Sequence, residues 1–524
     1  MRKTTLIIGM ALCTYLVQAQ YTCPKSAKED KENIMSEAYW KLWNPAVQEK
    51  IDRDIEKNRM GIAEVNLPGV PKGTSVTVEQ TKNDFVFGAH IFNYDQLGTP
   101  EANKKYKQLY GDLFNSATVA FYWRTFETEP NRPRFAEEYW DTQEYWNKQT
   151  DPKNQPHWRR PSSDKVVDYC VSRGIRVQGH PLVWGSREWQ IPTWIFTECM
   201  TPDEQIKVRK YISNLDSVKN VRVNGKYFTK TCEKYTDAYK NATAEQLSQE
   251  FPELAKTMKH LFAKRIQEMA EHYGNRVNSW DVVNESAHDY SSGKMMPGSA
   301  ICKSAYGFMP GDYTYEGFQV AQKAFPDGVK LNINDYFMDP AYVAQVKDLR
   351  KRGCQIDLVG SQMHLFNPQS CLDVAAGKEI QTPDQVHKTM SMLGELGLPI
   401  HLSEITITAP NNDYKGQRIQ AIITRNLYRL WFSIEPMMGI TWWNVVDDCG
   451  APGEPSVSGL FSRDMQPKPA YYAMNELINK EWKTNLTTKA DKNGQIKFKG
   501  FKGEYRISWT DANGEKQIIN YHLK

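Results

Sequence analysis

Residues 280–285 read Trp280-Asp281-Val282-Val283-Asn284-Glu285, an apolar run that ends in an amide and a carboxylate. The β-branched pair in its middle favours a buried strand. Because burial penalises a charged side chain, a glutamate directly after such a strand is expected where the strand opens onto a polar cleft. The run therefore predicts a strand and, at its carboxyl end, a candidate site.

Seven further runs of this kind are spaced along the chain, and each is followed by enough residues for a helix. Strands that alternate with helices indicate a parallel sheet, and eight such units indicate an α/β fold of the closed (β/α)8 TIM barrel type. The eight predicted strands are Phe85–Phe92, Ser116–Trp123, Ile175–Trp184, Val277–Glu285, Val329–Tyr336, Ile356–His364, Pro399–Ile407 and Met438–Asp447.

Helical periods between the strands support this reading. Apolar residues repeat at spacings of three to four over residues 254–273 and stop at Gly274, and they repeat in the same way over residues 419–431, before Pro436. This spacing predicts two long amphipathic helices.

The amino terminus has the pattern of an export signal. Arg2 and Lys3 precede an apolar stretch that ends at Ala19, which predicts a leader over residues 1–19 and an exported protein, periplasmic, cell-surface or extracellular. No later run reaches the roughly 18 apolar residues that a membrane span needs. The formal charge of +4 falls to +2 without the two leader cations, which argues against nucleic acid as a partner.

Cysteine usage leaves the redox chemistry open. Eight cysteines follow the leader, and Cys199 and Cys232 flank one insertion, but connectivity cannot be deduced from spacing. No CxxC or histidine-rich spacing points to a metal site, so we expect no metal and no cofactor. We also expect a monomer.

Polar side chains fall at or near the carboxyl ends of five predicted strands, where a barrel of this type carries its site. A lone polar residue at a strand end is more often structural, but agreement over five strands favours a site. Two of these residues, Glu285 and Glu404, are glutamates, and glycoside hydrolysis uses such a carboxylate pair. Aromatic residues make up 12% of the chain, which suits stacking against sugar rings. The strand-end residues are His180, Asn284, Glu285, Asn334, Asp335, Gln362, His364 and Glu404.

Six ordered motifs resemble glycoside hydrolase family 10, the endo-β-1,4-xylanases. The resemblance covers about Phe85 to Leu477, and it implies a (β/α)8 barrel that cleaves β-1,4-xylan with retention of anomeric configuration. The motifs are Gly179-His180-Pro181-Leu182-Val183-Trp184, residues 280–285, Ser361-Gln362-Met363-His364, Ser403-Glu404, Thr441-Trp442-Trp443 and the closing segment Pro467-Lys468-Pro469-Ala470-Tyr471.

Carried over residue by residue, the resemblance implies that Glu285 is the acid/base and Glu404 the nucleophile. It implies that Asn284 hydrogen-bonds the 2-hydroxyl of the central sugar. Gln362 and His364 would position the nucleophile. The other implied sugar contacts are His180 and Trp184 beside the central sugar and Trp443 beneath it.

The chain departs from the family pattern at three places. After the second strand most members carry Glu-Asn and Lys-Trp for the nonreducing-side sugars, whereas residues 121–124 read Phe-Tyr-Trp-Arg, with Arg124 as the expected donor to sugar hydroxyls. Thr406 stands where an Asp is common, which removes a charge that would help to hold His364. The loop 447–455 lacks a further Trp, and its Gly and Pro residues predict a shaped loop over the cleft.

Flanking and inserted segments complete the expected organisation. Two β-prone pieces, Gly61–Gln80 and Ile496–Tyr521, are expected to pair into one accessory sheet with a structural role, with carbohydrate binding as the alternative. The aromatic-rich insertion over 139–158 predicts a loop that either packs on the barrel or contacts sugar. Met200–Phe251 predicts a solvated loop. The expected parts are the leader 1–19, an N-terminal segment 20–84, the catalytic barrel 85–480 and a C-terminal β segment 481–524.

These features favour an exported retaining endo-1,4-β-xylanase that binds xylan or xylo-oligosaccharides. The altered second strand leaves open a hydrolase that acts at chain ends or on oligosaccharides. A noncatalytic xylan-binding protein is the alternative from a different class, and the two glutamates together with Asn284 argue against it.

Overall fold

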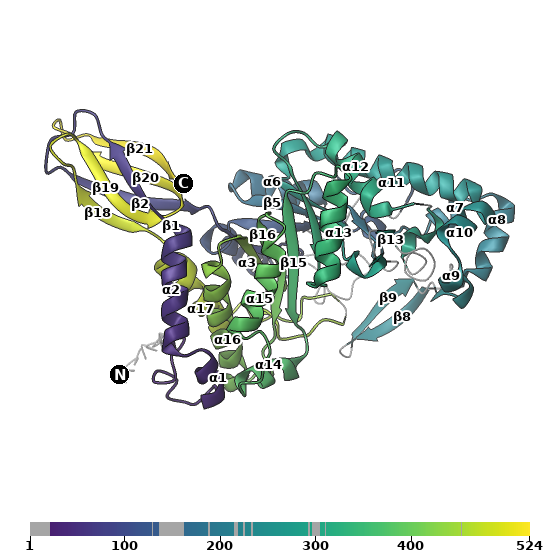
Figure 1. Ribbon diagram of the computed structural model, residues 1–524, viewed down its shortest axis with the longest axis horizontal. Helices are drawn as coiled ribbons and strands as arrows, with labels where there is room; N and C mark the ends of the chain where they lie inside the picture. Colours follow the sequence, from purple (N-terminus) through teal and green to yellow (C-terminus); the bar gives the residue numbers. More distant parts are fainter. Residues whose placement is uncertain are drawn as a thin grey trace, which may run out of the picture.

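The computed structural model describes residues 21–524 except 128, 136–161, 187–188, 214–217, 224–225, 232–233, 292–293, 296–303, 310 and 452. Eight parallel strands form a closed barrel (Figure 1). Each pairs with the strand that follows it in the ring, and the ring is closed by the pairings β17–β3 and β11–β14. The fold is therefore the predicted (β/α)8 barrel. Its strands are β3 (Val86–His90), β4 (Ser116–Ala120), β5 (Arg176–His180), β11 (Ser279–Asn284), β14 (Lys330–Asp335), β15 (Leu358–Leu365), β16 (Ile400–Ile407) and β17 (Met437–Trp442).

The second, third and eighth predicted strands depart most from the expectation, and the eighth stops at Trp442, five residues before Asp447. The second stops at Ala120, three residues early, and the chain turns into the short helix α4 (Trp123–Phe126). The third is interrupted at Pro181, which has no N–H to donate to the ladder, and it resumes as β6 (Val183–Trp184) beside β11.

Helices surround the barrel, and both predicted amphipathic helices are present. The first is α11 (Pro252–Tyr273), which ends at Gly274 with φ 48°. The second is α16 (Tyr414–Ser433), which is buried along most of its length because the N-terminal helix α2 (Pro45–Arg59) packs on its outer side. The other long helices are α3 (Pro100–Asp112), α6 (Ser163–Ser172), α12 (Tyr313–Ala324), α13 (Pro340–Lys351), α14 (Pro368–Ala375), α15 (Pro383–Gly394) and α17 (Pro469–Glu476).

The expectation of a solvated loop over Met200–Phe251 is wrong. Its described residues form helices and strands, and the side chains of Tyr239, Leu247 and Phe251 are fully buried. The polar composition hid short elements, and apolar residues such as Ile212, Tyr239 and Leu247 join the core of the barrel. The elements are α8 (Pro202–Lys207), β7 (Ile212–Ser213), β8 (Val218–Val223), β9 (Lys226–Thr231), β10 (Lys234–Tyr235), α9 (Asp237–Asn241) and α10 (Ala244–Glu250).

Both ends of the chain build a small β structure beside the barrel (Figure 1). It has two sheets where one was expected: β1 pairs with β19, and β18, β2, β20 and β21 form a second sheet. A separate apolar cluster that includes Val65, Val78, Phe498 and Ile507 fills the space they share. The strands are β1 (Met60–Asn66), β2 (Ser75–Asn83), β18 (Asn485–Lys489), β19 (Gln495–Phe501), β20 (Gly503–Thr510) and β21 (Lys516–Leu523).

Three expectations concern residues that are not described: the leader 1–19, the insertion 139–158 and Cys232. None of the helices in the described ranges combines the length and the apolar character that crossing a bilayer requires.

Candidate active site

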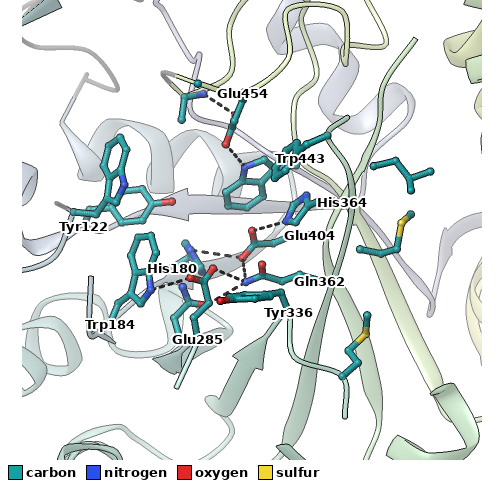
Figure 2. A pocket seen from close by; sticks show the side chains of 18 of the residues that line it. Tyr122, His180, Trp184, Glu285, Tyr336, Gln362, His364, Glu404, Trp443 and Glu454 are labelled. Atoms are coloured by element: carbon teal, nitrogen blue, oxygen red, sulfur yellow. Dashed lines mark hydrogen bonds and ion pairs between the residues drawn. The ribbon is translucent and has the colours of Figure 1, made fainter. Parts of the chain in front are cut away.

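A cleft of about 740 Å³ lies at the carboxyl ends of the barrel strands (Figure 2). Eight of the nine predicted site residues line it, from five different strands and the loops that follow them. The exception is Arg124. The predicted residues in the lining are His180, Trp184, Asn284, Glu285, Gln362, His364, Glu404 and Trp443.

One side-chain nitrogen joins the two glutamates. Gln362 Nε2 lies 3.1 Å from Glu285 Oε1 and 3.1 Å from Glu404 Oε1. An amide nitrogen carries two hydrogens, so it can donate one to each carboxylate. The two bound oxygens can be no farther apart than twice this distance, and the two carboxyl groups therefore face each other across the cleft.

Glu285 is held by both its backbone and its carboxylate. Its φ is 52°, in the left-handed region, and its N–H donates to the carbonyl of Asn334 at 2.8 Å. Its Oε2 accepts the indole N–H of Trp184 at 3.1 Å. Burial, and then the nearby charge of Glu404, raise the pKa of Glu285 from 4.5 to about 7. The side chain can therefore carry a proton near neutral pH.

Glu404 is surrounded by donors. Asn334 Nδ2 donates to its Oε1 at 2.9 Å, and Asn334 also donates to Asn284. His180 Nε2 lies 3.8 Å from Oε1, and His364 Nε2 lies 3.5 Å from Oε2. Two side-chain amides thus donate to Oε1 and two imidazole rings flank the carboxylate, and together they fix its orientation.

His180 and His364 are each oriented by a contact at Nδ1, the ring nitrogen that points away from Glu404. His180 Nδ1 lies 2.8 Å from Asp281 Oδ2. Burial lowers the pKa of His180, but the hydrogen bond to Asp281 and the charge of Glu404 outweigh it, and the net shift is upward. His364 Nδ1 lies 2.9 Å from the hydroxyl of Thr406. Thr406, whose lack of charge was expected to weaken the positioning of His364, thus contacts the imidazole of His364 directly.

The loop after β17 shapes the floor of the cleft. Glu454 Oε1 accepts the indole N–H of Trp443 at 3.3 Å, and Oε2 accepts the N–H of Ala451 at 2.7 Å and the side-chain amide of Asn444 at 3.0 Å. Glu454 therefore ties this loop to the tryptophan beneath the central position. Nothing in its local sequence indicates this role, because its partners are fixed by the turn of the loop.

Arg124 is not brought to the cleft. Because β4 ends at Ala120, Arg124 lies within α4, and its Nη2 donates to Thr193 Oγ1 at 2.9 Å. Tyr122 takes the place facing the cleft (Figure 2). It packs with Phe92 and Trp443 in a buried cluster, and its ring centroid lies 5.8 Å from that of Trp184.

Sequence reasoning also missed the aromatic residues on the opposite side. Tyr336 and Phe366 line the cleft, together with Met338. Tyr336 is 48% exposed and Phe366 37% exposed; one face of Phe366 stacks on His364 at 4.3 Å between ring centroids, and the exposed part of each ring is available for contact. The sequence could have indicated a place for Tyr336 in the cleft, because Tyr336 directly follows the polar pair Asn334-Asp335 at the end of β14.

Asn284 carries an unused donor. Its oxygen accepts from Asn334, while its Nδ2 is buried and has no hydrogen-bond partner among the described residues. A buried amide hydrogen without a partner costs free energy unless a ligand or water accepts it. Since Asn284 lines the cleft, a bound hydroxyl is a suitable acceptor.

In the described part of the chain, no three His, Cys, Asp or Glu side chains gather as a metal site would require. The expectation that no metal or cofactor takes part stays a prediction.

Comparisons with known proteins agree with the motifs. The chain is 24% identical over 390 residues to endo-1,4-beta-xylanase C of Paenibacillus barcinonensis, covering 68% of this chain and 28% of that protein. It is 23% identical over 337 residues to endo-1,4-beta-xylanase B of Thermotoga neapolitana, covering 61% and 75%. The chain spans about a quarter of the length of the first curated relatives that it matches.

Among solved structures, xylanase 10B of Thermotoga petrophila RKU-1 in complex with xylobiose covers 76% of this chain and 95% of its own, with 19% identity and a TM-score of 0.48. The model of the family Glycosyl hydrolase family 10 matches residues 79–225 and 235–477, more than half of the chain. The chain therefore belongs to glycosyl hydrolase family 10.

Proposed function

We propose that this protein hydrolyses the β-1,4-xylosidic bonds of xylan by double displacement, with retention of configuration. The observation that carries the proposal is the single amide nitrogen of Gln362 within 3.1 Å of both Glu285 and Glu404. Retaining enzymes hold their carboxyl groups about 5–5.5 Å apart, whereas inverting enzymes need about 6.5–9.5 Å to admit a water. A pair bridged by one nitrogen fits the retaining class.

In the first step, a carboxylate oxygen of Glu404 attacks the anomeric carbon of the central xylose. The bond from that carbon to the bridging oxygen breaks, and the oxygen leaves with the proton of Glu285. The products are a glycosyl ester on Glu404, an ionised Glu285 and a released sugar chain.

In the second step, Glu285 takes a proton from water, and the water oxygen attacks the same carbon. The ester bond breaks, Glu404 regains its charge and Glu285 is protonated again. Ester formation removes the negative charge of Glu404, which is one of the causes of the raised pKa of Glu285. Glu285 therefore still carries its proton when ester formation begins, and its pKa falls afterwards, so that it is ionised when it must act as a base.

The remaining residues support this chemistry. The free amide hydrogen of Asn284 suits the 2-hydroxyl of the central sugar, and a hydrogen bond there that strengthens in the transition state accelerates the reaction. Trp443 offers an apolar surface beneath the ring.

The first candidate for the position of cleavage is the internal bonds of the xylan chain, because curated relatives are named endo-1,4-beta-xylanases. One observation favours a second candidate, action at chain ends or on oligosaccharides. The end of β4, where family resemblance places the contacts to nonreducing-side sugars, is filled by the packed ring of Tyr122.

A time course of products from glucuronoxylan and arabinoxylan separates the candidates. Mixed oligosaccharides that appear early, and that vanish in a Glu404→Ala variant, support internal attack. A single short product supports chain-end action. Binding without hydrolysis by the wild type would instead identify a noncatalytic xylan-binding protein.

We also propose that the protein is exported, on the strength of the leader pattern at residues 1–19. Cell fractionation and amino-terminal sequencing of the secreted protein test this, and a mature chain that retains Met1 in the cytoplasm would contradict it.

A further inference from the structure

The carboxylate of Asp335 lies at the end of β14 and receives two backbone N–H groups. Its Oδ2 accepts the N–H of Ala287 at 2.8 Å, and its Oδ1 accepts the N–H of Phe337 at 2.8 Å. Asp335 is fully buried and is not among the side chains that line the cleft. One carboxylate therefore joins the segment after Glu285 to the segment after β14.

The segment it holds begins at an unfavourable backbone conformation. Glu285 has φ 52°, and a residue with a Cβ adopts this region only when its surroundings fix it. The N–H of Glu285 is bound by the carbonyl of Asn334 at 2.8 Å. Two residues later, Ala287 is bound by Asp335. The turn is thus fastened on both sides by consecutive residues of β14.

We propose that Asp335 is a positioning residue for the acid/base: by holding Ala287 it fixes the left-handed turn at Glu285 and keeps that carboxyl directed at the leaving oxygen. The proposal rests on the proposed role of Glu285. It assigns Asp335 no contact with substrate.

The same carboxylate acts on Glu285 electrostatically. The ionisable groups that act on Glu285 include Glu404 from β16, Asp335 from β14 and His180 from β5, and the phenol of Tyr336 also interacts with its charge. The two carboxylates oppose ionisation of Glu285, and His180 favours it. Burial raises the pKa of Asp335 to about 6, and its backbone hydrogen bonds and His288 act against that rise. Removing the charge of Asp335 therefore lowers the pKa of Glu285, and loosening the turn acts in the same direction by admitting water.

A purely structural role for Asp335 makes a different prediction. If it only anchored the loop of Tyr336 and Phe337, its loss would slow all substrates alike and leave the pH profile in place. If it positions the acid, its loss matters in proportion to how much the leaving group needs a proton. Leaving-group dependence is thus the decisive readout.

The test compares the full-length wild type with Asp335→Asn on aryl β-xylosides. With a phenyl leaving group, which needs protonation, kcat/KM should fall by about 10- to 100-fold, within the range of general acid catalysis. With 2,4-dinitrophenyl, which leaves without a proton, the fall should be less than about threefold. The alkaline limb of the pH profile should move to lower pH.

Asp289→Asn is the matched control. Asp289 is similarly buried and lies four residues after Glu285, but its carboxylate accepts the hydroxyl of Tyr313. We expect this variant to slow both xylosides equally, if at all, with the alkaline limb in place.

A readout independent of turnover keeps the inference testable. Carbon-13 NMR titration of labelled glutamate carboxyls should give a lower pKa for Glu285 in Asp335→Asn than in the wild type. An unchanged pKa, or equal losses on both xylosides, would overturn the proposal. A wild type that hydrolyses neither the xylosides nor xylan would refute the proposed function alone, because the titration would still report on Asp335.

Discussion

His364 Nδ1 lies 2.9 Å from the hydroxyl of Thr406, so an alcohol orients the imidazole whose other nitrogen faces the nucleophile. An alcohol can hold a ring in place without adding a charge to the site. It is a neutral replacement for the aspartate that many family members carry there.

Replacing Thr406 by Val tests this contact. Valine has the same shape but no hydroxyl, so we expect the imidazole to lose its orientation and kcat/KM on xylan to fall by about 3- to 10-fold, equivalent to the loss of about 1 kcal/mol. Steady-state kinetics measure the change. Thr406→Ser, which keeps the hydroxyl, should retain most of the activity, and equal losses in both variants would contradict a hydrogen-bonding role.

The pH profile of kcat/KM should be a bell. Activity requires ionised Glu404 on the acid side and protonated Glu285 on the alkaline side, and the alkaline limb should fall near the pKa of about 7. In Glu285→Gln, assayed on an activated aryl glycoside with azide as the nucleophile, this limb should disappear. An unchanged bell in that variant would assign the limb to another group.

Glu285 should also make stability depend on pH. Its pKa is raised in the folded protein, so the unfolded chain binds fewer protons and the free energy of unfolding falls as pH rises from about 4.5 to about 7. Glu285→Gln removes this penalty. We expect the variant to be more stable than the wild type at pH 8, by on the order of 2 kcal/mol, and equally stable at pH 4. Thermal unfolding at the two pH values checks this.

Tyr122 should determine how much a second nonreducing-side xylose contributes to binding. If its packed ring fills that position, the wild type should hydrolyse an aryl xylobioside with kcat/KM within about threefold of the aryl xyloside, whereas Tyr122→Ala should favour the xylobioside by about tenfold or more. Tyr122→Phe keeps the ring and serves as the control. A strong xylobioside preference in the wild type would show that the ring stacks on sugar instead of excluding it.

The barrel was predictable because most of its strands carry their own signal. An apolar core that ends in polar residues, as in residues 280–285, marks both the strand and the face of the barrel it reaches. The second strand was overextended because Phe121, Tyr122 and Trp123 have high β propensity, although tertiary packing buries them around a helical turn. Because of that error, Arg124 was expected in the site, whereas it lies within α4.

The grouping of Glu285, Glu404 and Asn284 in one cleft was predictable, and the contacts that support them were not. The strand-end glutamates and Asn284 are adjacent to apolar runs, which makes them visible in sequence. The partnerships of Glu454 with Trp443 and of Asp335 with Ala287 depend on loop paths and on strands that meet only in three dimensions. No local pattern encodes such pairs.

The interleaving of the chain's two ends has a consequence for biosynthesis. β2 lies between β18 and β20, and β1 pairs with β19. While the ribosome is still making the barrel, β1 and β2 lack the partners they have in the folded protein, and their apolar faces and open edges must wait for residues 485–510. These later residues thus complete strands that emerge about 400 residues before them, so a chain terminated within the barrel carries exposed strand edges that mark it for aggregation or degradation.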